Sequence, residues 1–99
     1  ALPGVGAAVT ARRVVIAGRV QGVGYRDWMV AEAVRLGVHG WVRNRRDDTV
    51  EALVSGEEGA VQALLSACRQ GPPAARIDTI TEEFTDPPDA PGFRRAPTV

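Results

Sequence analysis

The stretch Gly18-Arg19-Val20-Gln21-Gly22-Val23-Gly24-Tyr25-Arg26 contains three glycines within seven residues. It lies between an apolar run typical of a strand (14–17) and a run typical of a helix (28–36). Glycine adopts positive φ at little cost and has no Cβ, so several backbone N–H groups can converge on one anion. The helix start adds unpaired N–H groups, and Arg26 adds a guanidinium that can bind two oxygens of a phosphate. The stretch therefore predicts a phosphoryl-binding loop between a strand and a helix.

Strand and helix patterns continue on both sides of this loop. A β-branched run predicts a strand from about Thr10 to Gly18, and the helix is predicted to run from Arg26 or Asp27 to Leu36. Two further strand-like runs, 38–44 and 49–54, are joined by four polar residues, which predicts a hairpin. Asn44 is the last residue before this turn, where its side chain can leave the sheet and reach a neighbouring loop.

The second half of the chain again shows a helix pattern followed by a strand pattern. Ser55-x-x-Glu58 predicts a capping box that starts a second helix, and Gly71-Pro72-Pro73 ends that helix. Its apolar residues recur at helical spacing: Val61, Leu64, Leu65 and Cys68. Residues 76–84 predict a fourth strand, and 93–95 could add a short fifth edge strand. The order βαββαβ predicts an α+β, ferredoxin-like sandwich, in which a four-stranded antiparallel sheet carries both helices on one face.

Composition limits the kinds of partner. Twelve basic and twelve acidic residues cancel, so no overall field attracts nucleic acid or a membrane, and no apolar run approaches a membrane span. One cysteine excludes an internal disulfide, which suits a reducing compartment. We expect a flexible N-terminal tail over residues 1–9, without a secretory signal, and a single domain over 10–99. We also expect a soluble, cytoplasmic monomer that binds neither nucleic acid nor membranes.

The inventory of reactive residues narrows the chemistry. The chain has no Ser/His/Asp or Cys/His constellation, no metal-ligand spacing and no Gly-Lys-Ser/Thr after the glycine loop. A phosphomonoester hydrolase normally needs a metal pair, a nucleophile or a general acid for its alkoxide leaving group. An acyl phosphate instead releases a carboxylate, whose conjugate acid has a pKa of about 4 to 5, without a proton donor. Charge neutralisation and a well-placed water suffice for that reaction, so no metal or other cofactor is expected.

Several separated motifs resemble the acylphosphatase family over roughly residues 12 to 84. They are Gly18-x-Val20-Gln21-Gly22-Val23-x-Tyr25-Arg26, Gly40-Trp41-Val42-x-Asn44, Thr49-Val50-Glu51 and Gly71-Pro72-Pro73-Ala74-Ala75-Arg76. Tyr25 stands where the family more often has Phe, and Asp48 where its hairpin usually has Gly. The resemblance implies hydrolysis of acyl phosphates to a carboxylate and inorganic phosphate, with phosphate also acting as an inhibitor.

The resemblance also implies roles for two side chains. Arg26 would bind the phosphoryl group and Asn44 would hold the attacking water. The phosphate-binding loop is predicted to supply its backbone N–H groups from Gln21, Gly22, Val23, Gly24, Tyr25 and Arg26.

Other functions fit parts of the pattern. One is a non-catalytic ferredoxin-like module that binds an anion or nucleic acid, and another is a regulatory or carbamoyl-transfer module. Nucleic-acid binding would need paired aromatics on the central strands and a basic face, and the first strand has no aromatic. We expect His39 to be structural, Cys68 to lie in the core, and Arg43, Arg45 and Arg46 to be solvated. Trp41 could pack under the sheet or lie on its open face.

Overall fold

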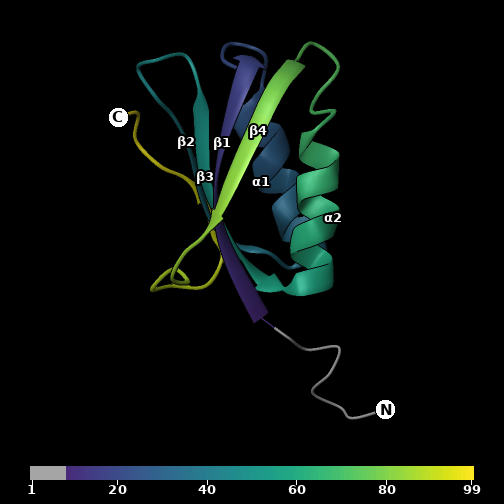
Figure 1. The fold of residues 1–99 in the computed structure, drawn as a ribbon, viewed down its shortest axis with the longest axis vertical. Coiled ribbons are helices and arrows are strands. Elements are labelled where there is room, and N and C mark those ends of the chain that lie inside the picture. The colour runs from purple at the N-terminus through teal and green to yellow at the C-terminus, as the bar shows by residue number, and fades with distance from the viewer. Residues whose placement is uncertain (1–8) are drawn as a thin grey trace.

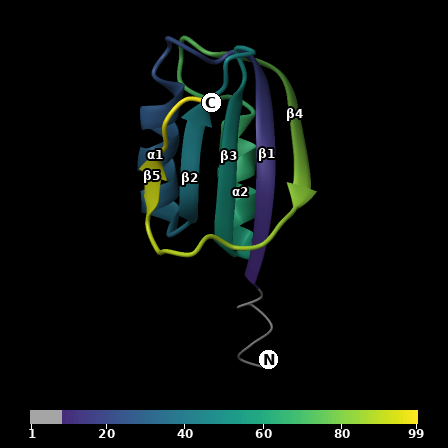
Figure 2. The same ribbon diagram turned by 90° about the vertical axis from the view of Figure 1, so that its left-hand side faces the viewer.

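A computed structural model describes residues 9–99, which form one sheet covered on one face by two helices (Figures 1 and 2). The elements are β1 (Val9–Arg19), α1 (Tyr25–Leu36), β2 (His39–Asn44), β3 (Val50–Glu57), α2 (Glu58–Cys68), β4 (Arg76–Phe84) and β5 (Phe93–Arg95). The strand order is β4-β1-β3-β2-β5. The first four strands pair antiparallel, and β5 pairs parallel to β2. The predicted ferredoxin-like fold is confirmed, and 93–95 forms the fifth strand.

The predicted N-terminal tail over residues 1–9 lies outside the described residues except for Val9. Val9 is the first residue of β1 and pairs with Glu57 of β3. None of the helices within residues 9–99 has the length and apolar character needed to cross a lipid bilayer.

The predicted capping box at Ser55 is wrong. β3 continues to Glu57, and Ser55 is buried between Ala11 of β1 and His39 of β2, with which it pairs. α2 begins only at Glu58, and its N-cap residue makes no capping hydrogen bond from its side chain. Pairing with strands on both sides satisfies the backbone of this segment, so the sheet overrides the local helix signal.

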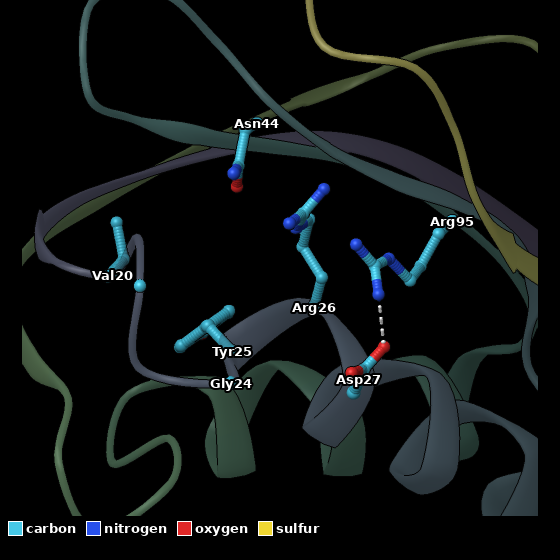
Figure 3. A pocket seen from close by; sticks show the side chains of 8 residues that line it. Val20, Gly24, Tyr25, Arg26, Asp27, Asn44 and Arg95 are labelled. Carbon is cyan, nitrogen blue, oxygen red and sulfur yellow. Dashed lines mark hydrogen bonds and ion pairs between the residues drawn. The ribbon is translucent and has the colours of Figure 1, made fainter.

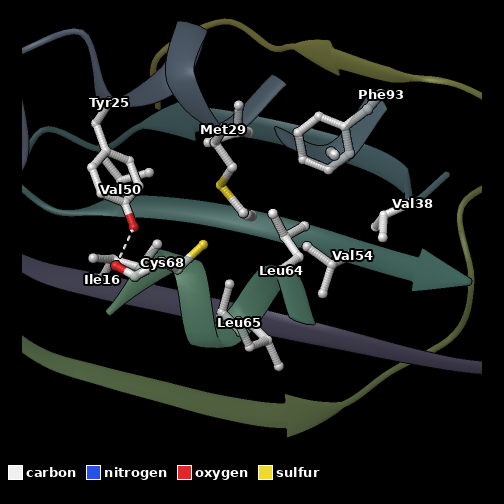
Figure 4. Close-up of a cluster of buried hydrophobic side chains, with 14 of the residues drawn as sticks. Ile16, Tyr25, Met29, Val38, Val50, Val54, Leu64, Leu65, Cys68 and Phe93 are labelled. Carbon is white, nitrogen blue, oxygen red and sulfur yellow. Dashed lines mark hydrogen bonds between the residues drawn. The ribbon is translucent and has the colours of Figure 1, made fainter. Parts of the chain in front are cut away.

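The hydrophobic core lies between the sheet and the two helices (Figure 4). The predicted apolar stripe of α2 is buried throughout, and Tyr25, Met29 and Ala33 of α1 are buried, while Leu36 is partly exposed. The inner face of the two central strands supplies the opposing side chains: Val14, Ile16, Val50, Ala52 and Val54. Packing therefore fixes α1, and with it Arg26 in its first turn, against the sheet.

The open face of the sheet carries an ion-pair network around Glu51. The buried Glu51 carboxylate accepts hydrogen bonds from Arg13 Nε at 2.5 Å and Arg43 Nε at 2.7 Å. Arg43 also stacks over Trp41, which lies on this face, with its guanidinium carbon 4.4 Å from the ring centroid. Burial favours a higher pKa for Glu51, but the hydrogen bonds from Arg43 and Arg13 outweigh it and hold the pKa below its ordinary value.

We expect Glu51→Gln to lower the free energy of unfolding by about 2 kcal/mol at pH 7, because two arginines lose their carboxylate. Both arginines are partly exposed, which keeps the loss below that of a fully buried pair. Since the pKa of Glu51 is lower in the folded state, its stabilisation is complete above the unfolded pKa and is lost as pH falls through the folded pKa.

Urea denaturation from pH 7 down to pH 3 measures this difference. The difference in the free energy of unfolding between the wild type and Glu51→Gln should become smaller toward pH 3. Glu83→Gln is the matched control, because Glu83 binds the same Arg13 at the exposed surface and should matter little. A gap that stays constant down to pH 3 would contradict the assignment.

Candidate active site

The segment between β1 and α1 is shaped by two glycines in left-handed conformations. Gly22 has φ 72° and Gly24 has φ 79°, and a Cβ at either position would meet no atom within 4 Å. Glycine is thus favoured by the backbone conformation, and the space beside the loop stays open. Within residues 9–99, no backbone N–H group from 21 to 26 donates to a backbone carbonyl, and the Trp28 N–H donates to Gly24 O at 3.0 Å. The N–H groups of the predicted loop are therefore available to an anion.

Two side chains of this loop, Gln21 and Val23, anchor it to the rest of the domain. Gln21 Nε2 donates to the carbonyls of Arg45 at 2.8 Å and Thr49 at 2.9 Å, which ties the loop to the β2–β3 hairpin. Val23 packs against the hydrophobic core. The contact from Gln21 holds the loop next to the end of β2, where Asn44 lies.

A pocket of about 230 Å³ opens at this junction (Figure 3). Its lining residues are Val20, Gly22, Gly24, Tyr25, Arg26, Asp27, Asn44 and Arg95. Four of the six predicted loop residues and both predicted catalytic residues thus border one cavity. Arg26 forms no ion pair with any carboxylate in the described part of the chain, and its guanidinium extends toward the Asn44 amide in Figure 3.

Asn44 ends β2 on the face of the sheet that the helices cover. Its backbone carbonyl accepts a hydrogen bond from the Val99 N–H at 3.1 Å, which holds the strand end in place. Its side-chain Oδ1 is buried and has no hydrogen-bond partner among the described residues. A buried acceptor without a partner is unfavourable, so this oxygen is suited to bind a water or ligand that enters the pocket.

Tyr25 fixes the start of α1, which carries Arg26. Its ring is buried, and its hydroxyl donates to the carbonyl of Cys68 at the end of α2, at 2.9 Å. Burial raises the pKa of the Tyr25 hydroxyl and raises the pKa of the Cys68 thiol to about 11. Both groups are therefore neutral at pH 7, and Cys68 lies in the core as predicted.

The sequence-based predictions missed two charged residues of this pocket. Arg95 Nη1 donates to Asp27 Oδ1 at 2.8 Å, across 68 positions of sequence. The alternation of a strand offered a signal for Arg95, because it shares a face with Phe93, which is buried under the helices. Pairing of β5 with β2 could not be read from the sequence, so the neighbour of Arg95 stayed unknown.

His39 lies on the opposite face of β2 from Asn44 and does not border the pocket. It is exposed, and its Nδ1 accepts a hydrogen bond from the Gly92 N–H at 2.7 Å. This contact fastens the segment before β5 to β2, so His39 is structural as predicted. Among residues 9–99, no three His, Cys, Asp or Glu side chains are grouped to hold a metal ion.

Comparisons with known proteins agree over most of the chain. The family model described as Acylphosphatase matches residues 12–95. An acylphosphatase of Acidiphilium cryptum is 56% identical over 88 residues, which are 89% of this chain and 97% of that protein. An acylphosphatase structure from Coxiella burnetii superposes with a TM-score of 0.85 at 31% identity, covering 89% of this chain and 93% of the other. The crystal structure of an acylphosphatase from Bacillus subtilis superposes with a TM-score of 0.83 at 32% identity, covering 90% of this chain and 99% of the other.

Proposed function

The chain belongs to the acylphosphatase family and hydrolyses acyl phosphates to a carboxylate and inorganic phosphate, and we propose that the pocket at the start of α1 is where it does so. In this proposal the N–H groups of residues 21–26 and the Arg26 guanidinium bind the phosphoryl oxygens. The Asn44 side-chain amide positions the attacking water. Each group then does what its chemistry allows: the Arg26 guanidinium and the N–H groups neutralise charge, and the amide orients the water.

The reaction can proceed with these groups alone. The water oxygen forms a bond to phosphorus while the bond from phosphorus to the bridging oxygen breaks, and the electron pair of that bond leaves with the carboxylate. The protons of the water remain on the phosphate, so a dianionic acyl phosphate yields a carboxylate and dihydrogen phosphate. An amide does not titrate in this range, so Asn44 orients the water and a phosphoryl oxygen takes the proton.

One observation carries this proposal: Asn44 Oδ1, which is buried and has no hydrogen-bond partner within residues 9–99, borders the same pocket as Arg26 and the two positive-φ glycines. A turn asparagine with a purely structural role would spend its amide on the local backbone.

The test is hydrolysis of benzoyl phosphate by protein dialysed against a chelator. We expect the rate to be the same with and without EDTA, and inorganic phosphate to inhibit competitively, because it occupies the site of the phosphoryl group. A phosphomonoester such as 4-nitrophenyl phosphate is the control substrate and should be hydrolysed far more slowly. Among the described lining residues, Asp27 is the one carboxyl group, and its ion pair with Arg95 leaves no acid free for the leaving group. Activity that disappears with chelator and returns with a divalent metal would contradict the proposal.

A further inference from the structure

Arg95 reaches the pocket from the opposite side to the glycine loop. β5 runs parallel to β2 with Arg95 aligned to Val42, two positions before Asn44 on the same face. The strand spacing and the rise per residue put the Cα atoms of Arg95 and Asn44 roughly 8 Å apart. In Figure 3 the Arg26 guanidinium lies between the Asn44 amide and the Arg95 guanidinium. In this view the three groups follow one another across the pocket that all three residues line.

Among residues 9–99, Asp27 is the one carboxylate that lines this pocket, and it binds Arg95 rather than Arg26. The side chains of Arg95 and Asp27 are 46% and 71% exposed. An ion pair this exposed contributes little to stability, so Arg95 can exchange Asp27 for another anion at small cost. Asp27 keeps the guanidinium at the pocket in the absence of substrate.

The in-line geometry of phosphoryl transfer suggests a role for the Arg95 guanidinium. In phosphoryl transfer the attacking and leaving oxygens lie roughly in line, on opposite sides of the phosphorus. If Asn44 holds the water and Arg26 holds the phosphoryl group, the leaving oxygen lies on the side of Arg95. We propose that Arg95 binds the departing carboxylate and stabilises the negative charge that forms on it. This inference rests on the roles proposed for Arg26 and Asn44.

The chemistry of the leaving group suits this residue. As the bond between phosphorus and the bridging oxygen breaks, its electron pair moves onto the carboxylate, and much of this charge is already present in a loose transition state. A planar guanidinium matches the two oxygens of a carboxylate with two parallel hydrogen bonds. Its attraction grows as the charge grows, so Arg95 acts on the rate more than on substrate binding.

The test is the dependence of kcat on the leaving group in Arg95→Gln. Benzoyl phosphates with nitro, unsubstituted and methoxy rings differ in the pKa of the released acid and share the same phosphoryl group. We expect the variant to lose about 10-fold in kcat, less than the ~10²- to 10³-fold loss for an oxyanion-hole donor, because a carboxylate is already a good leaving group. The loss should be larger for the methoxy than for the nitro compound. Inhibition by inorganic phosphate should stay as in the wild type, while inhibition by benzoate should weaken.

Arg94→Gln is the matched control, since it removes the same charge from the next residue, whose side chain lines a different pocket beside Trp41. It should leave the leaving-group dependence unchanged. An equal loss of kcat in Arg95→Gln for all ring substituents would overturn the inference and indicate a role in folding. Weaker inhibition by phosphate would also overturn it and indicate that Arg95 binds the phosphoryl group. Either result leaves the proposed function intact, because that depends on Arg26, Asn44 and the chelator assay.

Discussion

Arg26→Ala should lower kcat/KM for an acyl phosphate by about 10³-fold or more, the range for loss of an arginine that stabilises a transferring phosphoryl group. Arg26 has no carboxylate partner in the described part of the chain, so its full charge is available to the substrate. Both binding and turnover should suffer, because the phosphoryl group is anionic in the ground state and in the transition state. Stability should change little, since the side chain makes no ion pair with another residue between 9 and 99.

Initial rates with benzoyl phosphate and the inhibition constant of inorganic phosphate measure the two effects separately. Arg26→Lys keeps the charge but loses the two-pronged geometry, so it should recover only a small part of the activity. Arg35→Ala is the matched control, because it removes an exposed arginine from the other end of α1. Wild-type inhibition by phosphate in Arg26→Ala would show that this guanidinium is not the phosphoryl ligand.

The fold could be predicted because, along most of the chain, the spacing of apolar residues and the residues that end helices indicate the same elements. Gly37 adopts the left-handed conformation that ends α1, and the apolar stripe of α2 is buried as its spacing indicates. Asp48, placed where the related hairpins usually have glycine, is the one non-glycine residue between 9 and 99 with positive φ, at 72°. The turn therefore keeps a left-handed conformation at this position. The capping-box prediction at Ser55 was wrong because pairing with strands on both sides outweighs the local capping signature.

The candidate site was predictable only where its residues are local or carry a motif. The glycines and Arg26 are neighbours in sequence, and Asn44 stands at a strand end that the hairpin pattern identifies. Arg95 depends on a contact 68 positions away in sequence, and the Glu51 network depends on the pairing of three strands. Pairing partners of this kind are set by packing of the whole domain, which a local pattern does not contain.

Asn44→Ala should lower kcat by about 10² to 10³-fold, the usual effect of removing one precisely placed hydrogen-bonding group from a transition state. The reason is the buried Oδ1, which has no partner within residues 9–99 and borders the pocket. A water held there is already positioned when substrate binds, and without the amide it must be ordered during the reaction. KM and inhibition by phosphate should stay within a few-fold of the wild type, because Arg26 and the loop N–H groups remain.

Single-turnover rates with benzoyl phosphate, together with urea denaturation, separate loss of chemistry from loss of fold. Asn44→Asp is the isosteric comparison: it keeps an oxygen that can accept from water but adds a negative charge beside an anionic substrate. It should therefore weaken inhibition by phosphate, which Asn44→Ala should not do, and it should not restore kcat. If Asn44→Ala instead kept wild-type kcat while raising KM, the amide would be a ligand of the phosphoryl group and the water would have to be held elsewhere. The contrast with Arg26→Ala, in which binding and turnover fall together, makes the two roles separable by the same pair of assays.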